Sequence, residues 1–394
     1  MNILRILLFF NIILTQNNYP IILIHGFMGW GADEMGGYSY WGGDSSLFKN
    51  LNKKGANIFE VSVGPISSNW DRAIEAYYQI KGGQVDYGLL HSEKYKIIQK
   101  PVTKNFDGIY PQWDALHPVH IVGHSMGGQT ARMLEYLLTQ EFFINEEIKE
   151  KSNLLGNANT GWVKSITSIA TPHDGSTLTY LITSTIPFIQ YFAGIAGILG
   201  NSYFNFDLQH FGFHRIEKEP WISYVTRISQ SSILKTNNFS SYDLSLDGAM
   251  DLNGYLQASP NIYYFSFVTS TTHKDKKTDL QIPIDETPLI NKARAKLIGT
   301  RSGYWLNGEQ TDALWFENDG VVNTISMYGP TTGANGSDPI IEYDKNDLLI
   351  TGQWYWQKIE KMDHWSILGH FGSESKKTRA RKFFNDHVKL LKSL

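Results

Sequence analysis

The chain has 394 residues, of which 42% are hydrophobic and 19% charged, and this composition excludes a disordered, collagen-like or coiled-coil protein. Lysine and arginine number 35 against 38 acidic residues, so the formal net charge of −3 offers no broad basic surface for nucleic acid. The absence of cysteine excludes disulfide frameworks, thiolate nucleophiles and cysteine metal sites.

The amino terminus has the pattern of a secretory leader. Arg5 precedes an apolar run at residues 6–14, which is too short for a helix that spans a bilayer. We therefore predict a signal peptide at residues 1–16, a secreted protein, no stable transmembrane anchor, and a single domain over residues 17–394. A buried first helix is the alternative.

Four apolar runs have the character of strands that are buried on both faces of a parallel sheet. They lie at residues 19–24, 119–122, 163–170 and 262–268, and a helical pattern follows the second of them at residues 129–138. Short apolar strands that alternate with helices predict an α/β fold with a mostly parallel central sheet flanked by helices. A basic last helix, within residues 376–394, is expected to dock on that sheet rather than to bind a membrane surface.

A long stretch without charge separates Asp174 from Asp207. It imitates a membrane span, but Pro187 interrupts it and no Lys or Arg flanks it. A buried helical hairpin would account for the stretch. A movable apolar cover over a ligand site is the interpretation we favour.

The segment Gly123-His-Ser-Met-Gly127 matches the G-x-S-x-G pattern, between a predicted strand and a predicted helix. A nucleophile on so tight a turn leaves no room for neighbouring Cβ atoms, which explains the two glycines. We predict that Ser125 is a nucleophile, against the alternative of a tight turn with an inert serine.

A serine nucleophile needs a base, and the base needs a carboxylate to orient it. In α/β-hydrolases these follow the serine in the order Asp or Glu, then His. His364, in a loop ahead of the last helix, and Asp319, on a turn with Gly320 at an expected strand end, fit that order. His370 competes with His364, and an ordinary Asp-Gly turn is the alternative for Asp319.

Two backbone N–H groups must meet the negative charge that develops on the substrate oxygen. One is expected from Met126, the residue after the nucleophile. The other is expected from Phe27, because His25-Gly-Phe27 bends sharply at the end of the first strand. A simple strand-ending turn is the alternative.

With these motifs in place, the chain resembles the secreted true lipases of Geobacillus and Staphylococcus, which have the α/β-hydrolase fold. The likeness runs from about Tyr19 to about Gly369, in order, through His25-Gly-Phe-Met-Gly-Trp-Gly31, Tyr40-Trp-Gly-Gly43, Ser68-Asn-Trp-Asp-Arg-Ala73, Val85-Asp-Tyr-Gly88, Gln129-Thr-Ala-Arg-Met133, Ile169-Ala-Thr-Pro-His-Asp-Gly175, Tyr242-Asp-Leu-Ser245 and Glu317-Asn-Asp-Gly320. The resemblance implies hydrolysis of triacylglycerols and other esters by a Ser125, Asp319 and His364 triad. It also implies a lid at about residues 176–233 and a small extra subdomain.

Metal sites of that family survive only in part. The resemblance implies a structural zinc with ligands at Asp71, His91 and Asp243, but the fourth position falls at Ile97, which cannot bind a metal. Zinc is therefore a possible cofactor, and each of the three residues could instead serve a helix end, the surface or a turn. Calcium is not expected, since its acidic positions appear as Ser366 and Phe371.

The leading hypothesis is a secreted triacylglycerol lipase that acts on lipid esters at a lipid–water interface, needs no cofactor for its chemistry and binds no nucleic acid. A phospholipase or an acyltransferase with the same triad is the alternative within the enzymes, because pocket shape selects the leaving and accepting groups. A lipid-binding protein without activity is the alternative from another class.

Overall fold

The computed structural model describes residues 16–183, apart from 33 and 44–46, together with residues 209–213, 216, 219–220, 223–224, 226–227 and 236–394. The predicted signal peptide lies outside these residues except for Gln16, and so does most of the predicted lid. Within the described ranges, no helix combines the length and the apolar character that crossing a bilayer requires.

A seven-stranded sheet forms the centre of the molecule, and every neighbouring pair of its strands is parallel. The strand order is β10-β11-β7-β6-β5-β1-β2. The strands are β1 (Ile21–Ile24), β2 (Ile58–Val61), β5 (Val119–His124), β6 (Val163–Ile169), β7 (Tyr263–Ser270), β10 (Ile340–Glu342) and β11 (Trp354–Glu360). The four strands predicted from the sequence are β1, β5, β6 and β7, which occupy the middle of the sheet.

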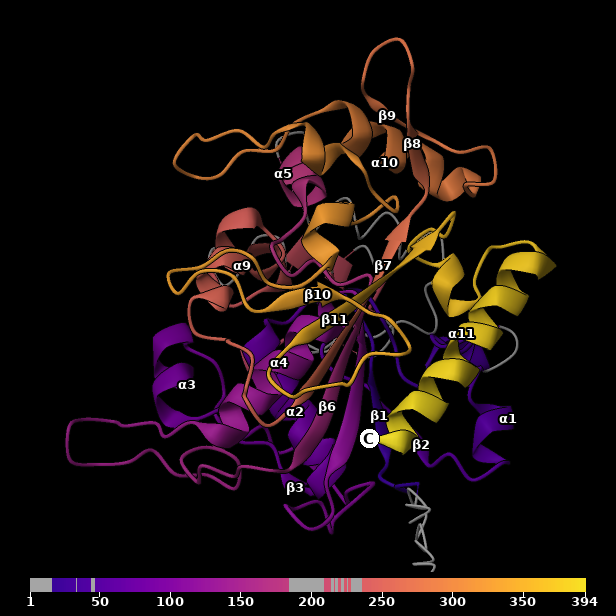
Figure 1. Ribbon diagram of the computed structural model, residues 1–394. Helices are drawn as coiled ribbons and strands as arrows, with labels where there is room; N and C mark the ends of the chain where they lie inside the picture. The colour runs from indigo at the N-terminus through magenta and orange to yellow at the C-terminus, as the bar shows by residue number, and fades with distance from the viewer. Residues whose placement is uncertain are drawn as a thin grey trace, which may run out of the picture.

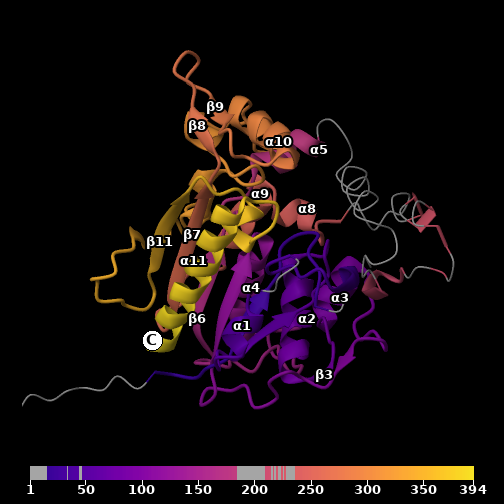
Figure 2. The same ribbon diagram turned by 90° about the vertical axis from the view of Figure 1, so that its right-hand side faces the viewer.

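Helices cover both faces of this sheet (Figures 1 and 2). They are α1 (Lys49–Asn52), α2 (Asn69–Lys81), α3 (Leu89–Tyr95), α4 (Met126–Thr139), α5 (Thr177–Thr183), α8 (Ser240–Asp243), α9 (Leu246–Asn253), α10 (Leu289–Thr300) and α11 (Glu374–Ser393). Two short antiparallel pairs lie outside the main sheet, β3 (Gly83–Gln84) with β4 (Asn105–Phe106) and β8 (Thr272–Lys274) with β9 (Gln281–Pro283).

Neighbouring side chains of β6 show which helix covers which face. Thr167 bonds to Nε2 of His387 in α11 at 2.8 Å, whereas Ser168 packs against Gly128 in α4. Because successive residues of a strand point to opposite faces, α11 and α4 lie on opposite sides of the sheet. The last helix therefore docks on the sheet as the sequence predicts, with Val388 and Leu391 in the core.

The carboxyl ends of the parallel strands meet at one edge of the sheet, and α5, α10 and the β8–β9 pair gather beyond that edge (Figure 1). The described start of the predicted lid is anchored there. Leu178 and Ile182 of α5 pack on Ile298 of α10, and the Thr177 N–H donates to Oδ1 of Asn323 at 2.9 Å.

Candidate active site

Ser125 lies on the tight turn between β5 and α4, with φ 57° and ψ −130°. A Cβ atom on Gly123 would lie 2.2 Å from the backbone of Gly127, and one on Gly127 would lie 2.2 Å from the carbonyl oxygen of Ile24. Both glycines of the motif are thus required by contact with neighbouring backbone. A residue held at a rarely populated positive φ between two such glycines is the geometry expected of a nucleophile elbow.

Asp319 and His364 form a buried pair. Nδ1 of His364 lies 2.8 Å from Oδ2 of Asp319, and the His364 backbone N–H donates to the Asp319 carbonyl at 3.1 Å. Three further donors surround the carboxylate, namely the Thr269 hydroxyl at 2.7 Å and the N–H groups of Val321 and Val322 at 3.0 and 2.8 Å. Asp319 can only accept, so Nδ1 of His364 carries the proton and Nε2 is left as the basic nitrogen.

The position of Asp319 differs in one respect from the sequence prediction. It does not end a strand but lies in a turn between two short 3-10 helices, Ala313–Phe316 and Thr324–Met327, closed by a bridge between Asn318 and Asn323. The N–H groups of Val321 and Val322 in this turn bond to Oδ1, and the Thr269 hydroxyl of β7 bonds to Oδ2, so the turn and the strand together orient the carboxylate toward His364.

His370, the competitor of His364, is committed elsewhere. Its Nδ1 lies 2.8 Å from the Tyr38 hydroxyl, and its Nε2 lies 2.7 Å from the Tyr40 carbonyl oxygen. The pairing with Asp319 therefore favours His364 as the base.

His364 lies beside the turn that carries Ser125. Its ring centroid is 4.6 Å from that of His124, and its carbonyl oxygen is 3.0 Å from Nε2 of His124. Within the described part of the chain, no hydrogen bond joins the Ser125 hydroxyl directly to the His364 ring. Such bonds are often long in ligand-free enzymes and tighten when substrate binds.

A chain of hydrogen bonds links the loop after β1 to His364. The Gly26 N–H donates to the Tyr40 hydroxyl at 2.9 Å, this hydroxyl lies 2.6 Å from Nδ1 of His124, and Nε2 of His124 reaches the His364 carbonyl. A carbonyl only accepts, so Nε2 of His124 carries the proton. Burial, and next the neighbouring His364, lower the pKa of His124 well below its ordinary value, so the ring is neutral and Nδ1 accepts from Tyr40.

The loop after β1 is also held by Arg72, a fully buried residue of α2. Its guanidinium donates to the carbonyl of His25, to that of Gly64 at 2.8 Å and to the Thr130 hydroxyl at 3.0 Å. A Cβ atom on Gly26 would lie 2.6 Å from Cβ of Ser125, so the backbone that leads to Phe27 lies against the nucleophile turn. Met126, the other predicted oxyanion donor, is buried at the first position of α4.

The predicted zinc ligands gather only in part. Oδ1 of Asp71 lies 2.8 Å from Nε2 of His91, but its Oδ2 is taken by Nε2 of His210 at 3.1 Å and by the Asn238 amide at 2.8 Å. Asp243 instead accepts the Asn69 N–H at 2.5 Å. In the described part of the chain, no three acidic or histidine side chains are arranged to hold one metal ion. The residues as placed do not fit the zinc that the resemblance implies.

His210 was not predicted to lie in this cluster. Its carbonyl oxygen accepts the Ile98 N–H at 2.6 Å, which sets the histidine beside the position where the family pattern lacks its fourth ligand. A contact between residues so distant in sequence carries no local signal. Tyr40, His124 and Arg72 lie in motifs that the sequence revealed, but their hydrogen bonds to distant residues left no local pattern either.

A buried lysine, Lys376, lies close to the loop that carries His364. Nζ of Lys376 lies 3.5 Å from Oδ2 of Asp363 and donates to the Glu286 carbonyl at 3.0 Å, and the lysine is only 7% exposed. Oδ1 of Asp363 accepts from the Asn291 amide at 2.7 Å. The Lys376 ammonium therefore places a positive charge beside the buried Asp363 carboxylate.

A parallel sheet with a serine on a strained strand-to-helix turn and a buried Asp–His pair at its carboxyl edge defines an α/β-hydrolase. A family model described as lipase-like, C-terminal domain, matches residues 17–392, and the chain belongs to that family. Both the fold and the family predicted from the sequence are thereby confirmed.

Individual relatives agree with this assignment. The chain is similar to the lipase of Staphylococcus hyicus, with 35% identity over 378 residues that cover 92% of this chain and 55% of the relative. It is similar in structure to EstA from Clostridium botulinum, with a TM-score of 0.86, 36% identity and coverage of 96% of this chain and 88% of that one. It is also similar in structure to lipase 1 from Pelosinus fermentans, with a TM-score of 0.82 and 33% identity, and the match covers 96% of this chain and 99% of that one. The chain spans about half the length of the curated relatives it matches.

Proposed function

We propose that this chain is a secreted lipase that hydrolyses carboxylic esters of lipids, triacylglycerols foremost. The observation that carries the proposal is the Asp319–His364 pair, 2.8 Å apart and buried beside the turn that holds Ser125. The names of the relatives support lipid esters as the substrate class, and the apolar leader pattern at residues 1–16 supports secretion.

In the proposed reaction, the Ser125 hydroxyl attacks the ester carbonyl while Nε2 of His364 accepts its proton. The oxyanion that forms accepts hydrogen bonds from the backbone N–H groups of Phe27 and Met126. His364 then returns the proton to the departing alcohol, which leaves an acyl group on Ser125. A water molecule then attacks the carbonyl of the acyl group while Nε2 of His364 accepts its proton. His364 returns that proton to the Ser125 oxygen as the carboxylic acid leaves, which restores the enzyme.

Asp319 acts in this scheme by holding one tautomer of His364 and by stabilising the imidazolium that forms. Every proton moves between Ser125, His364, substrate and water, so the chemistry needs no cofactor. We expect dialysis against a chelator to leave the rate of ester hydrolysis unchanged, and a rate lost on dialysis and restored by a divalent metal would contradict this part of the proposal.

The test of the proposal is covalent labelling of Ser125 with a fluorophosphonate probe. We expect a single labelled serine at position 125, and we expect Ser125→Ala to lose the label and at least about a thousandfold in kcat on a p-nitrophenyl ester. Ser375→Ala, which changes an exposed serine of α11, is the matched control and should behave as the wild type. Turnover retained by Ser125→Ala would refute the assignment.

Substrate class is tested separately, by initial rates on triolein, phosphatidylcholine and a short p-nitrophenyl ester, with and without an added alcohol. A lipase prefers triolein and releases free acid. Faster hydrolysis of phosphatidylcholine would identify a phospholipase, and transfer of the acyl group to the alcohol in preference to water would identify an acyltransferase.

A further inference from the structure

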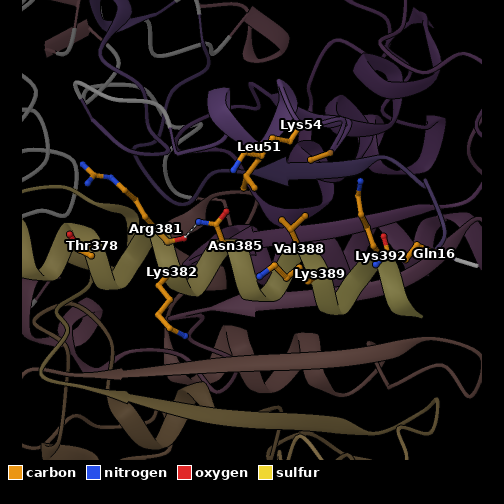
Figure 3. Close-up of a pocket in the computed structure, with 11 residues that line it drawn as sticks. Gln16, Leu51, Lys54, Thr378, Arg381, Lys382, Asn385, Val388, Lys389 and Lys392 are labelled. Carbon is orange, nitrogen blue, oxygen red and sulfur yellow. Dashed lines mark hydrogen bonds between the residues drawn. The ribbon is translucent and has the colours of Figure 1, made fainter. Parts of the chain in front are cut away.

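A groove of about 570 Å³ runs between the end of α1 and the side of α11 that faces it, and none of the predicted triad residues lines it (Figure 3). Five cationic side chains line the groove, together with three neutral side chains that can form hydrogen bonds and three apolar residues. In that order they are Lys54, Arg381, Lys382, Lys389, Lys392, Gln16, Thr378, Asn385, Leu51, Ala56 and Val388. Among the described residues, no carboxylate lines this groove.

The spacing of the α11 residues explains why they share one groove. Thr378, Arg381, Asn385, Val388 and Lys392 follow one another at intervals of three and four residues, which places them on a single face of a helix. The stripe from Arg381 to Lys392 extends for about 16 Å at 1.5 Å per residue. Lys54 faces it from the opposite wall, as Figure 3 shows.

The positive charge of α11 contrasts with the rest of the molecule. The helix carries seven Lys or Arg and two acidic residues, a net charge of +5, in a chain whose net charge is −3. One acid lies next to the groove, since Asp386 pairs with Lys382 at 2.6 Å and with Lys389 at 3.6 Å. Lys54 and Arg381 form no ion pair with any described residue, so their charges are available to a ligand.

We propose that this groove binds a linear polyanion that carries phosphate groups along its length. Arg381 and Lys392, the two cations of this stripe, are separated by about 16 Å along the helix, so a single phosphate could contact only one of them. Proteins that bind single-stranded nucleic acid commonly stack its bases on aromatic side chains, and the lining residues include no aromatic ring. A flat membrane surface favours protruding aromatic or aliphatic side chains, whereas two of the three apolar residues here, Ala56 and Val388, are buried.

The test uses long-chain inorganic polyphosphate as the probe and the full chain as the protein. Isothermal titration calorimetry at low salt should show binding of the wild type that weakens steeply as salt is added, because the contacts are between exposed charges. The double variant Lys54→Gln with Arg381→Gln should bind about tenfold more weakly and depend less on salt. Hydrolysis of a soluble ester, which does not involve the groove, should be unchanged and shows that the variant is folded.

The matched control is Lys276→Gln with Lys277→Gln, which removes two exposed charges from the loop between β8 and β9 and should retain wild-type affinity. Equal loss in both double variants would mean attraction by overall charge and would overturn the proposal. So would the absence of polyphosphate binding at low salt, or orthophosphate that binds as tightly as the polymer. Binding to phosphatidylglycerol vesicles that only the groove variant loses, without polyphosphate binding, would assign the surface to a membrane instead.

Discussion

At the scale of single residues, Tyr40 connects the loop of the predicted oxyanion donor Phe27 to the proposed base, His364. Its hydroxyl accepts from Gly26, next to the predicted oxyanion donor Phe27, and donates to His124, which in turn holds the backbone of His364. The buried Tyr40 hydroxyl thus fixes the position of the loop that carries Phe27 relative to the proposed base, His364. A displacement of about 1 Å between such groups can cost about a hundredfold in rate.

We therefore expect Tyr40→Phe to lower kcat on a p-nitrophenyl ester by about tenfold to a hundredfold, with little change in KM. The phenyl ring keeps the packing, but the Gly26 N–H and Nδ1 of His124 lose their partner while buried. Tyr38→Phe is the control, because the Tyr38 hydroxyl bonds to His370 and lies outside this chain of bonds. A wild-type kcat in Tyr40→Phe, or an effect on KM alone, would show that Tyr40 does not position the reacting groups.

The candidate site could be predicted where chemistry leaves a local pattern and not where it depends on distant contacts. Ser125 was visible because steric limits on the turn demand glycines at fixed positions, and Asp319 and His364 followed from the order of the triad along the chain. The second histidine on Asp71 was not visible, since His210 reaches it from 139 positions away.

At the scale of elements, the loop that carries His364 is tied to the start of α11 through Lys376 and Asp363. We expect Lys376→Met to lower the free energy of unfolding by about 3 to 5 kcal/mol, because it leaves the Asp363 carboxylate buried without its cation. Lys377→Met is the matched control. The Lys377 ammonium is half-buried and pairs with the exposed Glu374 at 3.3 Å, so its loss should cost at most about 1 kcal/mol.

Chemical denaturation followed by tryptophan fluorescence measures both variants. Lys376→Arg, which keeps the charge, should recover part of the stability. Equal losses in Lys376→Met and Lys377→Met would show that Asp363 does not depend on the buried ammonium.

The strands divide into those that the sequence reveals and those that it does not. β1, β5, β6 and β7 are central, and burial on both faces makes them nearly continuous apolar runs. β2, β10 and β11 were missed. β2 and β10 are the short edge strands of the sheet, and β11 carries Gln357, Lys358 and Glu360 on its exposed half. A strand that is half solvated loses the apolar run that identifies its neighbours.

At the scale of the whole molecule, several histidines are buried without charge. Burial lowers the pKa of His25, His120 and His387 to about 3. A histidine with a folded pKa below its unfolded value of 6.5 contributes stability that is complete above pH 6.5 and is lost as the pH falls toward 3. Burial raises the pKa of Glu60 and Glu135 to about 7, and these two act in the opposite direction, losing stability as the pH rises from 4.5 to 7.

A substitution at His387 allows the contribution of one buried histidine to stability to be measured separately. It lies on the sheet face of α11, where Nε2 bonds to the Thr167 hydroxyl at 2.8 Å and the ring packs on Phe267. His387→Gln keeps a partner for Thr167 and removes the titrating group. The two proteins should therefore differ in their response to acid, because only the wild type must exclude a proton that its unfolded chain binds.

The quantity to measure is the difference in unfolding free energy between the two proteins at pH 7.5 and at pH 5. We expect His387→Gln to be the less stable protein at pH 7.5 and the difference to shift in its favour by about 2 kcal/mol at pH 5, since 1.5 pH units below the unfolded pKa correspond to that free energy. Parallel pH profiles of wild type and His387→Gln would mean that His387 takes up its proton in the folded state, and that the interior beneath α11 admits charge.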